Sequence, residues 1–425
     1  MAVTPTPDAP PAWQRVSAGR RWAMLASSTA AQAASAAMVT GPAFLIPQLH
    51  TAYGMSLGEA GLVASAPLLG MMLTLIAWGV VVDHRGERFS LLVGLVAAAV
   101  GGGLAIAGAA TGDPGGSADA ARGPVVAMAL ALVLAGAASG ATNSASGRVV
   151  VGWFPPERRG LAMGIRQTAQ PLGVGLAAAT MAVLAERAGI GAALWVPTAA
   201  CALAAVVVAA VVLDPPRPQR HEAPAHAANP YRQDRFLARI HGASVLLVGP
   251  QFLVWTFGLT WLIDDLGWSA AAAGLLMLGT QLVGAGARIG AGWWSDVAGS
   301  RMRPMRQVAV LAAVTMLALG AAAAASGSVA WLTGAAVLLL VAASAITVAD
   351  NGLAFTAVAE RAGPFWSGRA MGMQNTAQHL MAAAVPPVAG LTITHLGYGA
   401  AFAIAAALPL AAVPLVPVAH ERLIS

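Results

Sequence analysis

This sequence contains no lysine, a single cysteine and few charged residues of any kind. All 23 basic residues are arginine, and charged residues make up 9% of the chain, whereas hydrophobic residues make up 58%. A soluble domain carries charge at about a quarter of its positions, so this composition excludes an ordinary soluble protein. The single cysteine, Cys201, excludes an internal disulfide. The composition indicates instead a chain whose surface lies mostly in a lipid bilayer.

Signatures of catalysis and of nucleotide binding are also missing. The chain has no G-x-x-x-x-G-K-[ST] phosphate loop, no H-E-x-x-H or G-x-S-x-G motif, and no soluble segment large enough for a catalytic domain. These absences argue against an ATP-driven pump and against a membrane enzyme. The net charge of +6 comes from arginines scattered between apolar runs, without the continuous basic surface that binds nucleic acid. We therefore expect no enzyme activity, no cofactor, no bound metal and no nucleic-acid partner.

Twelve apolar runs follow one another along the chain, and each is long enough to cross a bilayer core of about 30 Å as a helix. The first run is expected to continue through Gly41 and Pro42 to about Leu49 with a kink, because proline removes a backbone donor. The runs lie at about 22–49, 60–82, 89–111, 124–153, 160–185, 191–213, 240–263, 269–294, 306–325, 329–359, 369–394 and 398–418.

Arginine is distributed unequally between the two sides of these runs. Eighteen of the 23 arginines fall on one side and three lie within runs, which leaves Arg122 and Arg187 on the other side among acidic residues. Positive charge is retained on the cytoplasmic side of membrane proteins. We therefore expect a multi-pass protein of a bacterial cytoplasmic (inner) membrane, with both termini and the central loop in the cytoplasm.

One polar segment divides the twelve runs into six and six. Residues 214–237 are rich in proline, charge and histidine and have no apolar period over most of their length, which is typical of a solvated linker. The expected organisation is a cytoplasmic N-terminal tail (1–20), a six-helix bundle (21–213), a cytoplasmic linker (214–237), a second six-helix bundle (238–420) and a C-terminal tail (421–425).

Two signatures recur in both halves of the chain. The loop after the second run begins at Gly79 and the loop after the eighth begins at Gly292, and both read G-x-x-x-D-x-x-G-x-R at an offset of 213 positions. The segment GLAMGIRQTAQPL, from Gly160, returns as GRAMGMQNTAQHL from Gly368, with eight of thirteen positions identical at an offset of 208. Two motifs repeated at matching places indicate parallel halves that are related by an axis along the membrane normal.

The loop motif, placed between runs 2 and 3 and again between runs 8 and 9, resembles that of the major facilitator superfamily. The resemblance covers the chain from about Arg20 to Arg422. It implies an all-α membrane protein with twelve transmembrane helices in two pseudo-symmetric six-helix bundles. In that family spans 1, 4, 7 and 10 line a central cavity that opens alternately to each side, and spans 2, 5, 8 and 11 flank it. We therefore expect a secondary active transporter that works by alternating access as a monomer.

The repeated loop motif is expected to gate the cytoplasmic side. Its first glycine allows close helix approach, its second permits a tight turn, and its aspartate can cap the following helix and pair with the motif arginine. Arg148 and Glu360 are expected to extend the two charge networks. A role in folding and topology alone is the alternative. The gating candidates are Gly79, Asp83, Gly86 and Arg88 in the first half and Gly292, Asp296, Gly299 and Arg301 in the second.

One acidic residue out of seventeen, Asp350, falls well inside an apolar run. It lies ten residues before Glu360, or about 15 Å along a helix, which is close to the middle of the bilayer. His379 reaches a similar depth on the neighbouring run. Because charge at this depth marks pathways and relays, Asp350 and His379 are candidates for a proton relay, with a buried ion pair of Asp350 as the alternative.

Neutral amides accompany these two residues. Asn351 follows Asp350, and its counterpart in the first half, at the offset of 208, is Asn143. Hydrogen bonds between helices explain such amides as well as substrate contact does. The amide candidates for the substrate site are Asn143, Gln170, Asn351, Gln374 and Gln378.

Arg166 and Arg288 also lie deep within apolar runs. The segment RIGAGWWSD, which begins at Arg288, resembles the eighth span of facilitators for organic anions, including monocarboxylate and oxalate carriers. A guanidinium donates two parallel hydrogen bonds to a carboxylate or phosphate, so the two arginines are candidates for one anion site between the halves. The alternative is that Arg288 neutralises Asp350, which lies at nearly the same depth.

These features predict a proton-coupled carrier of a small organic anion or similar metabolite, with a small-molecule substrate, protons and the lipid bilayer as partners. The main variant is an exporter of drugs or other amphiphiles, although arginines within the membrane argue against a cavity for cations. A sensor that does not transport is the alternative of another class, and the short linker and tails offer it little surface for a signalling partner. In the exporter, Asp350 is the proton site and the substrate wall is formed by Phe252, Trp255, Phe257 and Trp261.

Overall fold

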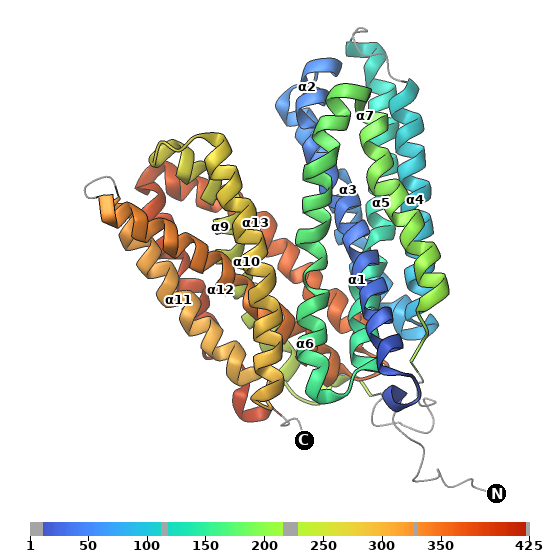
Figure 1. Cartoon of the computed structure of the whole chain (residues 1–425), viewed down its shortest axis with the longest axis vertical. Coiled ribbons are helices and arrows are strands. Elements are labelled where there is room, and N and C mark those ends of the chain that lie inside the picture. The colour runs from blue at the N-terminus through green and yellow to red at the C-terminus, as the bar shows by residue number, and fades with distance from the viewer. Residues whose placement is uncertain (1–11, 112–117, 216–227, 327–329, 422–425) are drawn as a thin grey trace, which may run out of the picture.

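The computed structural model describes residues 12–111, 118–215, 228–326 and 330–421, which form helices and short connections without a β-strand (Figure 1). Ten continuous helical runs in this part of the chain are long and apolar enough to cross a membrane. A helix satisfies its own backbone hydrogen bonds, and this is why apolar segments cross the bilayer in this form.

The helices follow the predicted apolar runs closely. The first half contains α1 (Ala18–Thr40), α2 (Ile46–Tyr53), α3 (Leu57–Arg85), α4 (Glu87–Thr111), α5 (Ala118–Trp153), α6 (Pro156–Arg166) and α7 (Ala169–Val211). The second half contains α9 (Phe236–Thr260), α10 (Ala270–Val297), α11 (Met302–Ala325), α12 (Ala330–Ala362), α13 (Ser367–Ala405) and α14 (Ala407–Ala412). A π-helical turn, Trp261–Asp265, extends α9.

Two of the ten runs contain two crossings each. The helices α7 and α13 are 43 and 39 residues long, and each is interrupted by a glycine in a non-helical conformation, Gly189 (φ 86°, ψ 169°) and Gly397 (φ 82°, ψ 169°). Glycine adopts this conformation readily because it has no Cβ. In Figure 1, α7 reaches one end of the bundle, turns there and runs back. Both turns together give twelve crossings, so the predicted fold class is confirmed.

The first crossing contains the predicted kink. The helix α1 ends at Thr40, a 3₁₀ segment occupies Gly41–Leu45, and α2 continues the same crossing to Tyr53. Pro42 lies at the start of the 3₁₀ segment, as expected for a residue that cannot donate the helical hydrogen bond.

The two halves meet at one end of the molecule and separate at the other (Figure 1). The described chain begins and finishes at the end where they meet, which is called the termini end below. Across the halves, α3 packs against α13 and α6 packs against α10. Parts of the expected linker (216–227) and of the two tails (1–11 and 422–425) lie outside the described residues, so the domain boundaries stay a prediction.

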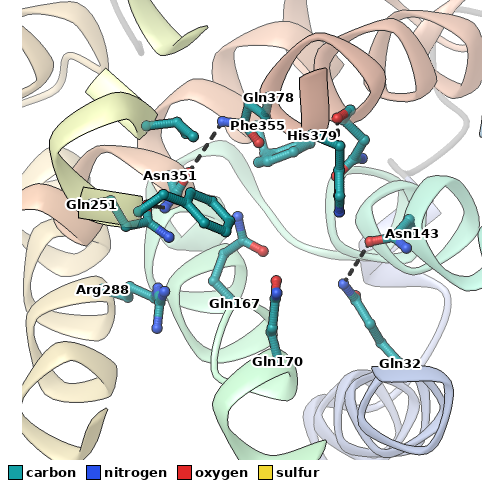
Figure 2. Close-up of a pocket in the computed structure, with 13 residues that line it drawn as sticks. Gln32, Asn143, Gln167, Gln170, Gln251, Arg288, Asn351, Phe355, Gln378 and His379 are labelled. Carbon is teal, nitrogen blue, oxygen red and sulfur yellow. Dashed lines mark hydrogen bonds between the residues drawn. The ribbon is translucent and has the colours of Figure 1, made fainter. Parts of the chain in front are cut away.

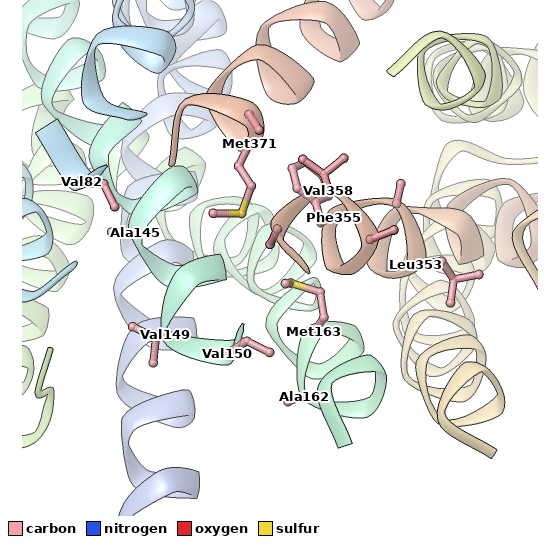
Figure 3. Close-up of a cluster of buried hydrophobic side chains, with 14 of the residues drawn as sticks. Val82, Ala145, Val149, Val150, Ala162, Met163, Leu353, Phe355, Val358 and Met371 are labelled. Atoms are coloured by element: carbon pink, nitrogen blue, oxygen red, sulfur yellow. The ribbon is translucent and has the colours of Figure 1, made fainter. Parts of the chain in front are cut away.

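A cluster of buried apolar side chains joins the halves near the termini end. Figure 3 shows side chains of this cluster from both halves, among them Val149 and Met163 of the first half and Val358 and Met371 of the second. All four are buried. Lipid is as apolar as these side chains, so their contribution is close packing rather than a hydrophobic driving force.

Within the first half, α3 and α5 pack backbone against backbone. A Cβ on Gly136 of α5 would lie 1.8 Å from the carbonyl oxygen of Pro67, and one on Gly70 of α3 would lie 2.0 Å from that of Val133. Gly103 of α4 differs, because a Cβ added there would have no neighbouring atom within 4 Å. Glycine is therefore required at position 136 and not at position 103.

We predict that Gly136→Ala destabilises the protein and that Gly103→Ala does not. At position 136 the added methyl group overlaps a backbone atom, and overpacking of this kind costs about 1–3 kcal/mol. At position 103 the same methyl group improves helix propensity by about 1 kcal/mol. Thermal unfolding in detergent measures both variants, and equal midpoints for the two would contradict this packing.

Candidate functional site

A hydrogen-bonded pair of amides lies in the middle of the first half. Gln32 of α1 donates from Nε2 to Oδ1 of Asn143 on α5 at 3.1 Å, and its Oε1 accepts from the hydroxyl of Ser146 at 2.7 Å. Gln32 and Ser146 are buried. These bonds tie spans 1 and 4 together at the depth where they face the second half.

The second half repeats this arrangement. Asn351 of α12 donates from Nδ2 to Oε1 of Gln251 on α9 at 2.9 Å. Gln378 of α13 donates from Nε2 to Oδ1 of Asn351 at 3.2 Å and to the hydroxyl of Ser244 at 2.7 Å. Since Asn351 is the counterpart of Asn143, each half presents one Gln–Asn pair from its first and fourth spans.

The two amide pairs lie on opposite sides of a cavity between the halves (Figure 2). Most of the wall consists of side chains that both donate and accept hydrogen bonds. The lining residues are Gln32, Asn143, Gln167, Gln170, Val248, Gln251, Phe252, Arg288, Asn351, Phe355, Asn375, Gln378 and His379.

A second cavity continues from the first toward the end opposite the termini. The two cavities share Gln32, Asn143, Gln170, Phe252 and His379. The remaining wall of the second cavity is mostly apolar and includes Val39, Leu68, Met71, Ala382 and Pro386. The polarity of the site therefore falls with distance from the termini end.

At the termini end the halves are in backbone contact. A Cβ on Gly79 of α3 would lie 2.5 Å from the carbonyl oxygen of Gly368 on α13. A Cβ on Gly292 of α10 would lie 2.1 Å from the carbonyl oxygen of Gly160 on α6. These tight contacts hold the halves together on this side of the cavity, and the two contacts correspond to each other by the internal repeat.

Asp83 caps a helix of the opposite half, not the helix that follows it as predicted. Its carboxylate accepts from the backbone N–H groups of Gly368 at 2.8 Å and Arg369 at 3.1 Å, in the first turn of α13. It also pairs with Nη1 of Arg148 at 3.0 Å and with Nε of Arg369 at 2.9 Å. Carboxylates are stabilised at helix N-termini by the free N–H groups and by the helix dipole. One buried charge therefore joins both halves.

Asp296 holds the second contact in the same way. It accepts from the backbone N–H groups of Gly160 at 2.9 Å and Leu161 at 2.8 Å, in the second turn of α6. Arg301 contacts Asp296 directly and reaches Glu360 at 3.5 Å, so the predicted pair and its extension are both present. Asp296 therefore also bonds to a helix of the other half, although not at the N-terminus of that helix.

Arg88 does not have the predicted partner. Its backbone N–H donates to Asp214 at 2.8 Å, and its Nη2 donates to the carbonyl oxygen of Ala209 at 2.6 Å. The predicted pair with Asp83 is therefore wrong, and Arg88 fastens the start of α4 to the end of α7 within one half. The loop glycines have the positive φ values of tight turns: Gly86 (100°) and Gly299 (60°).

Arg288 is a buried cation that faces the cavity. It is 3% exposed, it lines the cavity from α10, and its guanidinium carbon lies 5.7 Å from the centre of the Trp255 ring. Figure 2 shows the guanidinium directed into the cavity. In the described part of the chain no oxygen accepts a hydrogen bond from it, so its donors remain available to a solute.

Asp350 is fully buried beside this arginine. Its two carboxylate oxygens have no hydrogen-bond partner among the described residues, and it does not line the cavity, although Asn351 does. Its charge interacts with that of Arg288 without a direct hydrogen bond. Buried charges are costly unless they are paired and hydrogen-bonded, so this pair is only partly compensated.

Arg166 is not brought into the cavity with Arg288. It is 1% exposed and donates to the hydroxyl of Ser146 at 2.9 Å, the carbonyl oxygen of Asn143 at 2.7 Å and Oε1 of Gln167 at 3.0 Å. It is also absent from the lining residues. With these donors used, Arg166 supports the amide pair of the first half, and the structure does not form the two-arginine anion site that the sequence predicts.

His379 and Gln374 lie in different surroundings. His379 lines the cavity, and its Nδ1 lies 2.8 Å from the carbonyl oxygen of Asn375. No hydrogen bond in the described residues joins it to Asp350, so the predicted relay has no direct contact. Gln374 does not line the cavity and instead contacts the imidazole of His241 on α9.

Sequence reasoning missed Gln32 and Gln251, which complete the amide pairs. Each stands alone in an apolar run, and an isolated amide at mid-span was the available signal. Phe355, also in the wall, had no such signal. In the described residues no three His, Cys, Asp or Glu side chains are placed to hold a metal ion. Six of the nine predicted candidates line the cavity: Asn143, Gln170, Arg288, Asn351, Gln378 and His379.

We predict that Asp83→Asn loosens the contact at the termini end while each half stays folded. Asparagine loses the charge that Arg148 and Arg369 neutralise. A hydrogen bond to a charged group contributes about 1.5–3 kcal/mol, so the open state becomes about tenfold more populated or more. The measurement is the rate at which a maleimide labels Leu75→Cys, a buried position on α3, in a Cys201→Ser background.

His84→Ala is the matched control for this experiment. His84 follows Asp83 in the same motif near the end of α3, is exposed, and bonds to the carbonyl oxygen of Val80. Its loss leaves the contact between the halves unchanged. An unaltered labelling rate in Asp83→Asn, or the same increase in His84→Ala, would show that Asp83 does not hold the halves together.

Comparison with known sequences identifies the family. The sequence profile of the Major Facilitator Superfamily matches residues 25–386. An uncharacterized MFS-type transporter of Mycobacterium tuberculosis strain H37Rv is 48% identical over 403 residues, which are 94% of this chain and 85% of that protein. The same values hold for an uncharacterized MFS-type transporter of strain CDC 1551.

Solved structures share the fold at low sequence identity. A proton:xylose symporter superposes with a TM-score of 0.75 at 16% identity, over 94% of this chain and 95% of that chain. The E. coli fucose:proton symporter gives 0.71 at 15% identity, over 94% and 98%. The human organic anion transporter MFSD10 gives 0.67 at 18% identity, over 93% and 99%. With its repeated loop motif, twelve crossings and central cavity, this chain belongs to the major facilitator superfamily of multi-pass membrane transporters, which is not a family of enzymes.

Proposed function

We propose that this transporter carries a small organic anion together with protons by alternating access. The observation that carries the proposal is the pair of Arg288 and Asp350. Arg288 is a buried cation that faces the cavity without an acceptor, and Asp350 is a buried carboxylate without a donor. Charges at membrane depth are costly and mark substrate or proton pathways.

Arg288 supplies the anion site in this proposal. Its planar guanidinium matches a carboxylate with two parallel hydrogen bonds. The amides around it, such as Asn351 and Gln251, donate and accept hydrogen bonds and suit hydroxyl groups. The substrate class is therefore a small carboxylate with hydroxyl groups on its body. The structural neighbours include proton symporters of sugars and an organic anion transporter, which is consistent with this class.

Asp350 supplies the proton site. When Asp350 is ionised it neutralises Arg288, so an anionic substrate has to compete with it. When Asp350 is protonated, Arg288 has no counter-charge, and the carboxylate of the substrate takes that role. Proton and anion then bind together, because Arg288 can be neutralised either by Asp350 or by the carboxylate of the substrate. His379, which faces the same cavity, is a second candidate on the proton path.

We assign the termini end to the cytoplasm of a bacterial cell, because arginine is concentrated there. The glycine contacts and the hydrogen bonds of Asp83 and Asp296 then close the cytoplasmic side, and this conformation corresponds to the outward-open state. Transport requires these contacts to break while the opposite ends of the halves approach. Both halves of the cavity come from one chain, which supports a monomer as the transporting unit.

A proton-coupled exporter of amphiphiles is the second candidate. The apolar wall of the second cavity favours it, since Leu68, Met71 and Pro386 would suit a hydrophobic solute. The two candidates differ in their need for Arg288, because a hydrophobic or cationic solute gains nothing from a guanidinium. A thermal-stability screen with carboxylates, phosphates, sugars and drugs separates them.

We predict that Arg288→Gln removes the stabilisation of the protein by carboxylates. Glutamine lacks both the charge and the two parallel donors. Each hydrogen bond to a charged group contributes about 1.5–3 kcal/mol, so affinity falls by about 100-fold or more. Arg288→Lys keeps the charge without the planar fork and retains part of the affinity. The measurement is the shift in melting temperature over a series of carboxylate concentrations.

Arg306→Gln serves as the control, because Arg306 is an exposed arginine on α11 that lies outside the cavity. It should respond to carboxylates as the wild type does. Undiminished stabilisation of Arg288→Gln by carboxylates would overturn the anion site, and stabilisation of the wild type by drugs alone would support the exporter.

We predict that Asp350→Asn uncouples transport from protons. Asparagine has nearly the shape of aspartic acid and stays neutral, so it leaves Arg288 available to the substrate. In proteoliposomes, exchange of labelled for unlabelled anion continues, whereas a pH gradient no longer drives accumulation. Ser344→Ala is the control, since Ser344 is buried on the same helix and bonds to the carbonyl oxygen of Leu340. Accumulation equal to that of the wild type would place the proton site elsewhere.

A further inference from the structure

The outer face of α4 and the neighbouring α5 form an apolar groove on the first half, away from the central cavity. Its wall includes Val93, Val96, Val100 and Leu104 of α4 and Leu134 of α5. These side chains are large and exposed, with exposed fractions between 40% and 59%. In Figure 1, α4 lies at the outer edge of the molecule, on the side away from the second half. The groove therefore faces the acyl chains of the bilayer.

Glycines explain why a groove forms here. Gly94, Gly101 and Gly108 recur every seven residues on the face of α4 that meets α5. A Cβ on Gly94 would lie 2.4 Å from that of Ala141, and one on Gly101 would lie 2.8 Å from the backbone nitrogen of Ala135. Small residues let two membrane helices approach closely. The larger side chains of α4 and α5 that line the groove are exposed on the lipid side.

A basic residue stands at the termini end of this groove. Arg85 is exposed, and its guanidinium carbon lies 5.6 Å from the centre of the Phe89 ring. Phe89 is 41% exposed and precedes Val93 by one helical turn, so it continues the wall of the groove toward Arg85. The neighbouring acids are engaged elsewhere, because Glu87 pairs with Arg148 at 2.8 Å and Asp214 accepts from the backbone of Arg88.

We infer that this surface is a binding site for an anionic phospholipid, with one acyl chain in the groove and the phosphate on Arg85. The bilayer supplies a ligand that is apolar along the length of α4 and negative at the end where Arg85 lies. Each part of such a lipid has a matching part of the site. The methylene groups contact valine and leucine side chains, and the phosphate contacts the guanidinium of Arg85, which lies against Phe89 at the edge of the groove. The central cavity contributes nothing to this site, so the inference is independent of the transported solute.

The test is lipid binding by native mass spectrometry of the purified full-length protein. Dioleoylphosphatidylglycerol is the anionic probe and dioleoylphosphatidylcholine is the neutral one. The wild type should bind the first anionic lipid about fivefold more tightly than the neutral lipid, which is the effect of one arginine near an anionic surface. Arg85→Gln should reduce the affinity for phosphatidylglycerol to that for phosphatidylcholine. Val100→Trp, which fills the groove, should weaken the first binding event of both lipids.

Two controls on the second half separate this site from the surface in general. Arg303→Gln removes an exposed arginine from the start of α11, and Val314→Trp enlarges a valine on α11 that is 59% exposed. Neither should change the first binding event. Equal affinity of the wild type for the two lipids would overturn the inference. So would an effect of Arg303→Gln as large as that of Arg85→Gln, because the preference would then belong to the basic surface as a whole.

Discussion

The conformation depends on contacts between backbones at the termini end, where the two halves approach so closely that glycine is required on both sides. Each contact is held by one aspartate, since Asp83 and Asp296 accept from backbone N–H groups of the opposite half. The N–H groups of Gly368 and Arg369 lie in the first turn of α13, where the helix itself offers them no acceptor and water can replace the carboxylate of Asp83 when the halves separate. The contact between Gly136 and Pro67 lies within one half and offers no such replacement. The same kind of glycine packing thus gives a reversible contact in one place and a permanent one in the other.

The features that the sequence predicts correctly are those that are local or repeated. Twelve crossings follow from run lengths, the kink follows from Pro42, and the two related halves follow from motifs that recur at fixed offsets. The turns at Gly189 and Gly397 obey the same offset of 208, although neither breaks the apolar pattern enough to mark its conformation. The apolar runs and the repeated motifs are therefore enough to predict the fold, because each crossing is determined by its own residues.

The choice of partners could not be predicted in the same way. Motif spacing favours Arg88 as the partner of Asp83, and the sequence also suggests Arg148, which does pair with it at 3.0 Å. Arg369 of the opposite half, which the sequence does not suggest, pairs with Asp83 at 2.9 Å. Gln32 and Gln251 likewise become part of the site through neighbours more than ninety positions away. These pairings depend on how whole helices pack, and a local pattern does not contain that information. Arg166 is predicted as a site residue but does not line the cavity. Its depth in the membrane suggests that it binds a substrate, but it donates its hydrogen bonds to groups of its own half.

The internal repeat shows which cavity residues the two halves have in common and which occur in one half alone. Each half contributes a Gln–Asn pair to the cavity, so neutral hydrogen bonding to a solute is shared and a bound solute can bridge the halves. The ionisable residues Asp350, Arg288 and His379 of the second half are not repeated, because they correspond to Thr142, Leu75 and Pro171 at the repeat offsets. The first half does contain a buried cation at the depth of the cavity, Arg166, but its hydrogen bonds are to Ser146, Asn143 and Gln167 of the same half. At this depth the first half can therefore move past the other without separating a buried ion pair, which would be strongly destabilising. In the proposed cycle, Arg288 and Asp350 therefore stay together within the second half. Protonation of Asp350 removes the negative charge that neutralises Arg288, and neither residue has to change its neighbours.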